Sequence, residues 1–225
     1  MDRPFSGTIQ IKICGLTRPE EATACAALGA NAIGMVFHPP SPRHLDDAAA
    51  AAITAALPEN VAKIGVFVDT AVETILEGAR RCRLTGVQLH GNEPPETVLR
   101  LREAGLMVIK ALFAARMPDL KAAADYAPDA FLVECGRGKR PGGNAEVWNW
   151  AEARGLSASV PLVLAGGLSP ENVAEAIAAA APDAVDVSSG VEKAPGRKDL
   201  DRVAAFIHAA RKAATGRERG VFTPR

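Results

Sequence analysis

The chain has no excess of charge of either sign. Lys plus Arg and Asp plus Glu number 26 each among the 225 residues, so the formal net charge is +0. A chain balanced in this way has no general electrostatic attraction for nucleic acid or for an anionic membrane surface. We therefore expect no nucleic-acid partner, and any basic residue that matters should act locally.

Long hydrophobic runs are also missing. Every apolar stretch falls short of the roughly 20 uninterrupted residues that a membrane-spanning helix needs. Residues 1–7, MDRPFSG, lack the charged start and the apolar run of about 7–15 residues that characterise a signal peptide. We expect a cytoplasmic protein with no membrane partner.

Cysteine is scarce and scattered. The four cysteines are Cys14, Cys25, Cys82 and Cys135. Because they form no CxxC pair, the sequence predicts neither a zinc site nor a disulfide framework. Each is better judged singly.

No linker divides the chain. There is no Ser, Gly or Pro-rich connector, and hydrophobic segments recur evenly to about residue 212. We expect one domain at residues 1–213, followed by a flexible C-terminal tail at residues 214–225, which is polar and contains glycine.

What the sequence does contain is a strict alternation of short apolar segments and helical segments. Eight strands are predicted, at residues 11–14, 31–37, 61–68, 86–89, 106–112, 130–134, 160–164 and 184–187. Eight helices are predicted, at residues 19–28, 46–57, 71–81, 94–103, 117–124, 147–153, 170–180 and 200–212.

The predicted strands are apolar throughout, without a polar alternate face. Strands of this kind are buried on both sides, as in a parallel sheet covered by helices. Eight of them favour an α/β fold that is a single-domain (β/α)8 barrel, the TIM barrel, over an open doubly wound sheet. The first strand is followed by CGLT and carries no GxGxxG nucleotide fingerprint, which supports the same choice.

Active sites of such barrels lie where strands end, so the last residues of each strand are the first candidates. Lys12 and Cys14 stand two residues apart at the end of the first strand and share one of its faces. If that face looks into the barrel, the lysine lies beneath the thiol and favours the thiolate, which is the form that acts as a base or a nucleophile. A buried structural cysteine is the alternative.

Two other strands end in polar side chains. Glu134 ends the sixth strand, where an unpaired carboxylate is costly to bury, and it is the candidate general acid. A solvated charge at the strand end is the alternative. Gln88 and His90 share a face at the end of the fourth strand and could orient a substrate, although His90 could equally be a structural histidine.

Glycine-containing segments follow the last two strands. Gly166 and Gly167 come after the seventh strand, and Ser188, Ser189 and Gly190 come after the eighth. Backbone N–H groups in such loops can approach an anion closely, and barrels frequently bind phosphate at these two places. We predict a phosphate site there.

Arg43 lies in a rigid loop, PPSPRH, after the second strand. Its guanidinium is a candidate clamp for a substrate carboxylate, because its planar fork can hold both carboxylate oxygens. Taken alone, one surface arginine would carry no such meaning.

In these motifs the sequence resembles the phosphoribosylanthranilate isomerase family, barrel enzymes of tryptophan biosynthesis. The matching segments are KICGLT at residues 12–17, SPR at 41–43, QLHG at 88–91, PGGN at 141–144, GGLSPENV at 166–173, DVSSGVE at 186–192 and PGRKD at 195–199. They span nearly the whole chain in the family's order.

The resemblance implies a cofactor-independent Amadori rearrangement of the phosphosugar N-(5-phosphoribosyl)anthranilate to 1-(2-carboxyphenylamino)-1-deoxyribulose 5-phosphate. By similarity Cys14 is the general base and Glu134 the general acid, and no metal is implied. Substrate contacts carried over from the family fall on Lys12, Arg43, Gln88, His90, Gly143 and Asp186. The phosphate contacts expected from the two glycine-containing loops are Gly166, Gly167, Ser188, Ser189 and Gly190.

The chain departs from the family at the sixth strand. The family typically has aspartate where this chain has Glu134, and residues 144–150 read NAEVWNW where a Phe-Asp-Trp sequence is usual. Two alternatives stay open for this reason: a diverged barrel isomerase acting on another phosphosugar, and a sugar-phosphate binding protein that has lost the acid. The sequence is compatible with a monomer or a homodimer.

Overall fold

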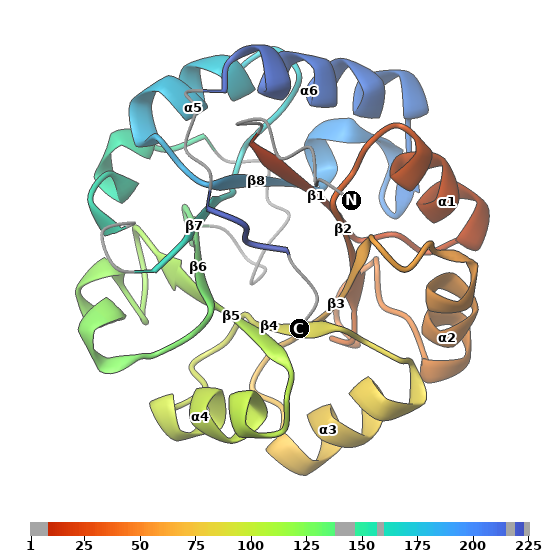
Figure 1. Cartoon of the computed structure of the whole chain (residues 1–225). Coiled ribbons are helices and arrows are strands. Elements are labelled where there is room, and N and C mark those ends of the chain that lie inside the picture. Colours follow the sequence, from red (N-terminus) through yellow and green to blue (C-terminus); the bar gives the residue numbers. More distant parts are fainter. Residues whose placement is uncertain (1–8, 138–146, 157–159, 215–218, 223–225) are drawn as a thin grey trace, which may run out of the picture.

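The computed structural model describes residues 9–137, 147–156, 160–214 and 219–222. Eight parallel strands close into a barrel in the order β1 to β8, and helices surround it (Figure 1). The prediction of a (β/α)8 barrel is therefore confirmed.

The barrel strands coincide closely with the predicted ones. They are β1 (Gln10–Cys14), β2 (Ala32–Val36), β3 (Ala62–Phe67), β4 (Gly86–Leu89), β5 (Met107–Phe113), β6 (Ala130–Glu134), β7 (Leu162–Leu164) and β8 (Ala184–Val187). The ring closes through β1 and β8, where Lys12 lies opposite Asp186 in the register.

Fewer α-helices form in the described part of the chain than the eight predicted. They are α1 (Pro19–Ala27), α2 (Asp47–Ala56), α3 (Val72–Arg81), α4 (Pro95–Glu103), α5 (Val173–Ala180) and α6 (Leu200–Lys212). Within the described residues, no helix is both long and apolar enough to cross a membrane.

Where helices were predicted at 117–124 and 147–153, shorter 3-10 helices form. These are η1 (Leu120–Asp125) and η2 (Trp150–Ala153). Pro118 and Pro128 flank η1, and because proline disfavours helical geometry in the residue before it, they limit how far this segment can extend. The helix predicted from residue 170 begins only at Val173, since the Asn172 side chain bonds back to Ser169 N at 2.8 Å and Gly167 O at 2.9 Å.

A small hairpin that we did not predict follows the eighth strand. After the 3-10 turn η4 (Ser189–Val191), β9 (Glu192–Ala194) pairs antiparallel with β10 (Arg197–Lys198). Glu21 of α1 anchors this hairpin, since its carboxylate accepts from Arg197 Nε at 2.7 Å and Lys198 N at 3.0 Å. The hairpin therefore sits beside the carboxyl ends of β1 and β8.

The hydrophobic core has two layers. Outward-facing strand residues such as Ile33 and Val87 pack against the helices, and inward-facing residues such as Ala32, Ile64 and Leu132 fill the barrel. Side chains alternate along a strand, which is why neighbours such as Ala32 and Ile33 belong to different layers.

Two residues of the C-terminal tail belong to the inner layer. Val221 and Phe222 are 5% and 3% exposed, and both donate their backbone N–H to Gln10 Oε1, at 2.5 and 2.8 Å. In Figure 1 this dark blue segment lies inside the ring of strands. Because Gln10 begins β1, the pair covers the end of the barrel opposite the strand ends that carry the candidate site. The expectation of a flexible tail is therefore wrong at these two residues.

We expect Phe222→Ala to lower the free energy of unfolding by about 2 kcal/mol, the value of burying a side chain of this size. Urea unfolding of the purified protein measures it. Leu99→Ala is the matched control, because Leu99 is 47% exposed and should lose less than about 0.5 kcal/mol. Equal unfolding midpoints for Phe222→Ala and the wild type would show that the tail adds nothing to stability.

Candidate active site

Strands β1 and β8 bring a thiol, an amine and a carboxylate together. Lys12 is fully buried, and its Nζ donates to Asp186 Oδ1 at 3.0 Å. Cys14 and Asp186 are each 8% exposed, at the carboxyl ends of their strands. The face that Lys12 and Cys14 share therefore looks into the barrel, which meets the condition for a lysine beneath the thiol.

The charges around Cys14 act against one another. Burial raises the pKa of the thiol, the Lys12 ammonium lowers it, Asp186 raises it again and Lys198 lowers it, and the net direction is upward. Burial also lowers the pKa of Lys12, but Asp186 and Cys14 more than compensate, so Lys12 stays charged. Lys12 thus favours the thiolate, but its effect on the pKa of Cys14 is smaller than that of burial.

Across the ring, Gln88, His90 and Glu134 form a chain of contacts. Gln88 Nε2 lies 2.9 Å from His90 Nδ1, and His90 Nε2 lies 3.3 Å from Glu134 Oε1. The ring of Phe113 meets His90 edge-on, with centroids 5.4 Å apart. Gln88 Oε1 is buried and finds no hydrogen-bond partner among the described residues. His90 thus contacts the candidate acid directly, and both of its ring nitrogens have a partner.

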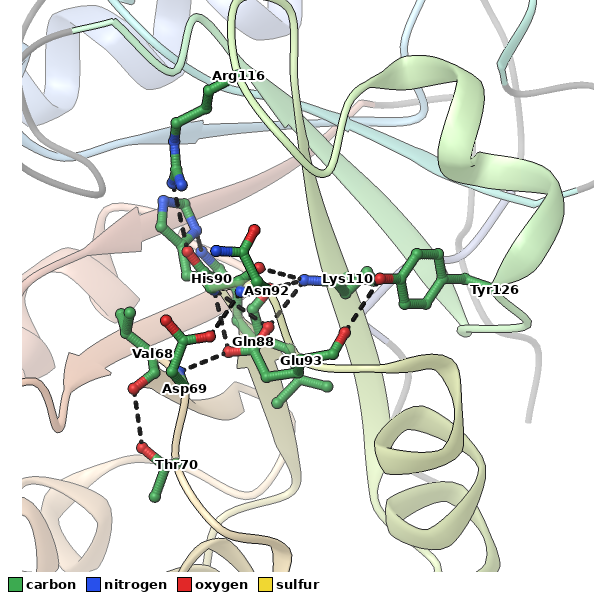
Figure 2. Close-up of polar contacts among 12 residues, drawn as sticks. Val68, Asp69, Thr70, Gln88, His90, Asn92, Glu93, Lys110, Arg116 and Tyr126 are labelled. Atoms are coloured by element: carbon green, nitrogen blue, oxygen red, sulfur yellow. Dashed lines mark hydrogen bonds and ion pairs between the residues drawn. The ribbon is translucent and has the colours of Figure 1, made fainter.

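A second buried ion pair supports the loop that carries His90 (Figure 2). Lys110 Nζ on β5 donates to Glu93 Oε2 at 2.8 Å and to Gly91 O at 2.7 Å. Glu93 also accepts from the backbone N–H of Asp69 and of Gly91, each at 3.0 Å. One carboxylate therefore ties the loops after β3 and β4 to β5, next to His90.

Our sequence reasoning missed Lys110 and Glu93. The signal was present, since Lys110 interrupts an apolar strand and a charged residue buried there needs a partner. Burial lowers the pKa of Lys110, and this outweighs the upward effect of Glu93.

The loops after β7 and β8 lie against each other. A Cβ on Gly190 would overlap the carbonyl oxygen of Leu168, and one on Gly166 would come within 3.0 Å of Glu134 Cβ. Gly166 and Gly167 both have positive φ, of 84° and 69°, which favours glycine. The two glycine segments predicted to form a phosphate site are thus adjacent, and the first also packs on Glu134.

Two tryptophans that follow the loop after β6 bind the backbone directly after β7. Trp148 Nε1 donates to Ala165 O at 3.0 Å, and Trp150 Nε1 donates to Gly166 O at 3.4 Å. The two indole N–H groups thus provide hydrogen bonds to backbone carbonyls at the glycine turn after β7. We predicted no role for either tryptophan from the sequence. Gly143 lies outside the described residues.

Arg43 does not stand free at the mouth of the barrel. It is 6% exposed, and its Nε and Nη2 donate to Glu192 Oε1 and Oε2 at 2.8 and 2.6 Å. Lys198 Nζ donates to the same Glu192 Oε1 at 2.8 Å and to Ser188 O at 3.1 Å. The expectation of an arginine reserved for the substrate is therefore incomplete, because Glu192, to which we gave no role, already holds one edge of its guanidinium and is itself bound by Lys198.

Apart from Gly143, the predicted residues lie at the carboxyl ends of the strands or in the loops that follow them. Cys14 and Glu134 end β1 and β6, which are separated in the ring by β7 and β8 and their glycine loops. Within the described ranges, no three His, Cys, Asp or Glu side chains are grouped as metal ligands.

Comparison with known proteins places this arrangement in a family. The sequence profile of N-(5'-phosphoribosyl)anthranilate (PRA) isomerase matches residues 11–209. A curated N-(5'-phosphoribosyl)anthranilate isomerase of Desulfatibacillum aliphaticivorans is 55% identical over 202 residues, which cover 90% of this chain and 93% of that protein.

Solved structures agree with the profile. Phosphoribosyl anthranilate isomerase from Thermotoga maritima matches with a TM-score of 0.83 and 39% identity, over 91% of this chain and 99% of that one. A phosphoribosyl anthranilate isomerase in complex with reduced 1-(o-carboxyphenylamino)-1-deoxyribulose 5-phosphate matches with a TM-score of 0.80 and 38% identity over the same shares. The chain belongs to the N-(5'-phosphoribosyl)anthranilate isomerase family.

Proposed function

We propose that this chain catalyses the reaction of its family, the Amadori rearrangement of N-(5'-phosphoribosyl)anthranilate in tryptophan biosynthesis. The observation that carries the proposal is the placement of Cys14 and Glu134 at the ends of β1 and β6, on either side of the glycine loops after β7 and β8. A ribose phosphate anchored at these loops would present its C1 and C2 between an acid and a base.

In the first step Glu134 acts as the general acid. It gives a proton to the ring oxygen of the furanose as the bond from C1 to that oxygen breaks, and the lone pair of the anthranilate nitrogen forms the C1=N bond of a Schiff base. His90, at 3.3 Å from Glu134 Oε1, orients the carboxyl group. Gly166 leaves room for Glu134 on its other side.

In the second step Cys14 acts as the general base. The thiolate takes the proton from C2, the electron pair of that bond forms C1=C2, and the iminium nitrogen becomes neutral. The resulting enolamine gives the ketone by moving a proton from the C2 hydroxyl to C1. Because the substrate's nitrogen accepts the electrons, no cofactor is needed. Lys12 lies beneath the thiol and stabilises its ionised form.

The remaining predicted residues bind the substrate. The phosphate contacts are proposed for Gly166, Gly167, Ser188, Ser189 and Gly190, and the carboxylate of the anthranilate ring for Arg43. Gln88 is buried and bonded to His90, the neighbour of the acid, and Asp186 is buried and bonded to Lys12 beneath the base; both are proposed to orient the sugar. Gly143 is proposed as a substrate contact, as the family resemblance implies.

Rescue of a tryptophan auxotroph that lacks the isomerase tests the proposed function. We expect growth without tryptophan when the chain is expressed, and none with a vector carrying Cys14→Ala and Glu134→Gln together. Failure of folded, expressed wild-type protein to rescue growth would favour a diverged isomerase or a binding protein. The cytoplasmic location and a monomeric or homodimeric state are further expectations of this proposal.

The rate should rise with pH through the neutral range. Since the net effect of burial and neighbouring charges raises the pKa of Cys14 above its ordinary value, only a small share of the thiol is ionised at neutral pH, and that share grows as the pH rises. Where the thiolate limits turnover, kcat should increase close to tenfold per pH unit. Steady-state kinetics from about pH 6 to about pH 9 measure it. A kcat independent of pH over this range would show that the base is already ionised or lies elsewhere.

A further inference from the structure

We propose that Glu192 is a positioning residue for substrate recognition, which holds Arg43 by one edge of its guanidinium so that the other edge binds the carboxylate of the substrate. The inference rests on the proposed function, because it concerns how that site recognises an aromatic ring bearing a carboxyl group.

The contacts of Arg43 divide its guanidinium into two edges. Glu192 occupies the edge formed by Nε and Nη2, with both carboxylate oxygens engaged at 2.8 and 2.6 Å. Among the described residues, none accepts a hydrogen bond from Nη1 of Arg43. A guanidinium has five N–H groups in a rigid plane, so the edge formed by Nη1 and Nη2 still offers a parallel pair of donors.

The Arg43 side chain lies at the candidate site. The Arg43 side chain passes over Gly15, next to the base, since a Cβ on Gly15 would overlap Arg43 Cδ and lie 3.0 Å from Ser188 Oγ. Cys14 is close enough to act on the pKa of Arg43. A carboxylate bound to the free edge would therefore lie over β1 and the loop after β8.

Charge balance favours a second anion at this place. Glu192 is the single carboxylate shared by Arg43 and Lys198, and the three side chains are 5%, 7% and 0% exposed, respectively. Burial lowers the pKa of Lys198, although Glu192 and Cys14 act in the opposite direction. When Lys198 is protonated, two buried cations share one carboxylate, and the excess positive charge is stabilised when an anionic ligand binds. If Glu192 instead blocked Arg43, the ligand would have to displace the Glu192 carboxylate from a buried, bidentate ion pair.

The two possible roles of Glu192, positioning Arg43 or blocking it, predict opposite results for Glu192→Gln. The experiment measures calorimetric binding of reduced 1-(o-carboxyphenylamino)-1-deoxyribulose 5-phosphate, and of the same compound without its carboxyl group. If Glu192 positions Arg43, Glu192→Gln should weaken binding of the carboxylated compound by about tenfold, the range of a lost charge-assisted hydrogen bond, and change binding of the other compound by less than about twofold. Unchanged or tighter binding of the carboxylated compound would overturn the inference, as would an equal loss for both compounds.

A double variant shows whether Glu192 acts through Arg43. In the Arg43→Met background, Glu192→Gln should change affinity by less than about twofold, because the group it positions is gone. A full tenfold loss in that background would overturn the inference. Should Glu192→Gln fail to fold, Glu192→Asp keeps the charge but shortens the side chain, and the same selective loss is expected.

Glu21→Gln is the matched control, because Glu21 anchors the same hairpin through Arg197 and Lys198 N without contacting Arg43. It should leave the affinity ratio of the two compounds within about twofold of the wild type; a selective loss there would mean that the hairpin as a whole, and not Glu192, is responsible. If the wild type binds neither compound, the proposed function fails. If the wild type binds both and Glu192→Gln equals it, only the present inference fails.

Discussion

Replacing Cys14 with Ala is expected to lower kcat by about a thousandfold or more, within the range that general acid–base groups contribute. The C2 proton then has no base, since Lys12 is held as an ammonium by Asp186 at 3.0 Å and cannot accept it. Steady-state turnover, followed by the loss of anthranilate-type fluorescence, measures the effect.

Ligand binding separates a lost base from a lost fold in this variant. Cys14→Ala should bind the reduced product analogue within a few fold of the wild type, because the thiol is not among the proposed phosphate or carboxylate contacts. A variant that binds the analogue and still turns over at more than about a tenth of the wild-type rate would remove Cys14 from the mechanism.

Glu134→Gln is expected to lower kcat by roughly a hundredfold to ten-thousandfold, because the amide cannot give a proton to the ring oxygen. The glutamine side chain has nearly the same shape and can still contact His90. A loss of rate therefore reports the missing proton donor and not a change in packing. The same fluorescence assay measures the effect, with analogue binding as the control.

Glu134→Asp should keep substantial activity, within about tenfold of the wild type. Aspartate still supplies the proton that the first step needs, but it is one methylene shorter and loses reach toward His90, so part of the rate is lost. Equal rates for Glu134→Gln and the wild type would place the acid elsewhere in the site.

Much of the fold followed from local patterns. The eight barrel strands agree with the predicted ones to within a few residues, since buried parallel strands are uniformly apolar and are bounded by turn residues. The strand parity that placed Lys12 and Cys14 on one inner face also holds, because the period of two is fixed by backbone geometry.

The errors arose where distant contacts decide the outcome. Arg43 pairs with Glu192, 149 positions away, and nothing local distinguishes a guanidinium held by its own chain from a free one. Val221 and Phe222 looked like part of a polar tail, yet the open end of the barrel and Gln10 provide a site for two apolar residues. Tertiary burial overrides local composition in both cases.

The site is held by buried ion pairs and not by apolar packing alone. Lys12 pairs with Asp186, Lys110 with Glu93, and Arg43 with Glu192. Buried pairs of this kind add little net stability, since desolvation offsets attraction, but they fix the side chains in one geometry before a ligand arrives. We interpret the carboxyl end of the barrel as built for positioning, while the opposite end, closed by Val221 and Phe222, serves stability.

Turnover of N-(5'-phosphoribosyl)anthranilate by the purified wild-type chain is the most direct test of this account. We predict that anthranilate-type fluorescence of the substrate disappears at a rate proportional to protein concentration, without added metal or cofactor. Protein that is folded and binds the reduced product analogue, but leaves that fluorescence unchanged, would contradict the assignment of Cys14 and Glu134 as a working base and acid.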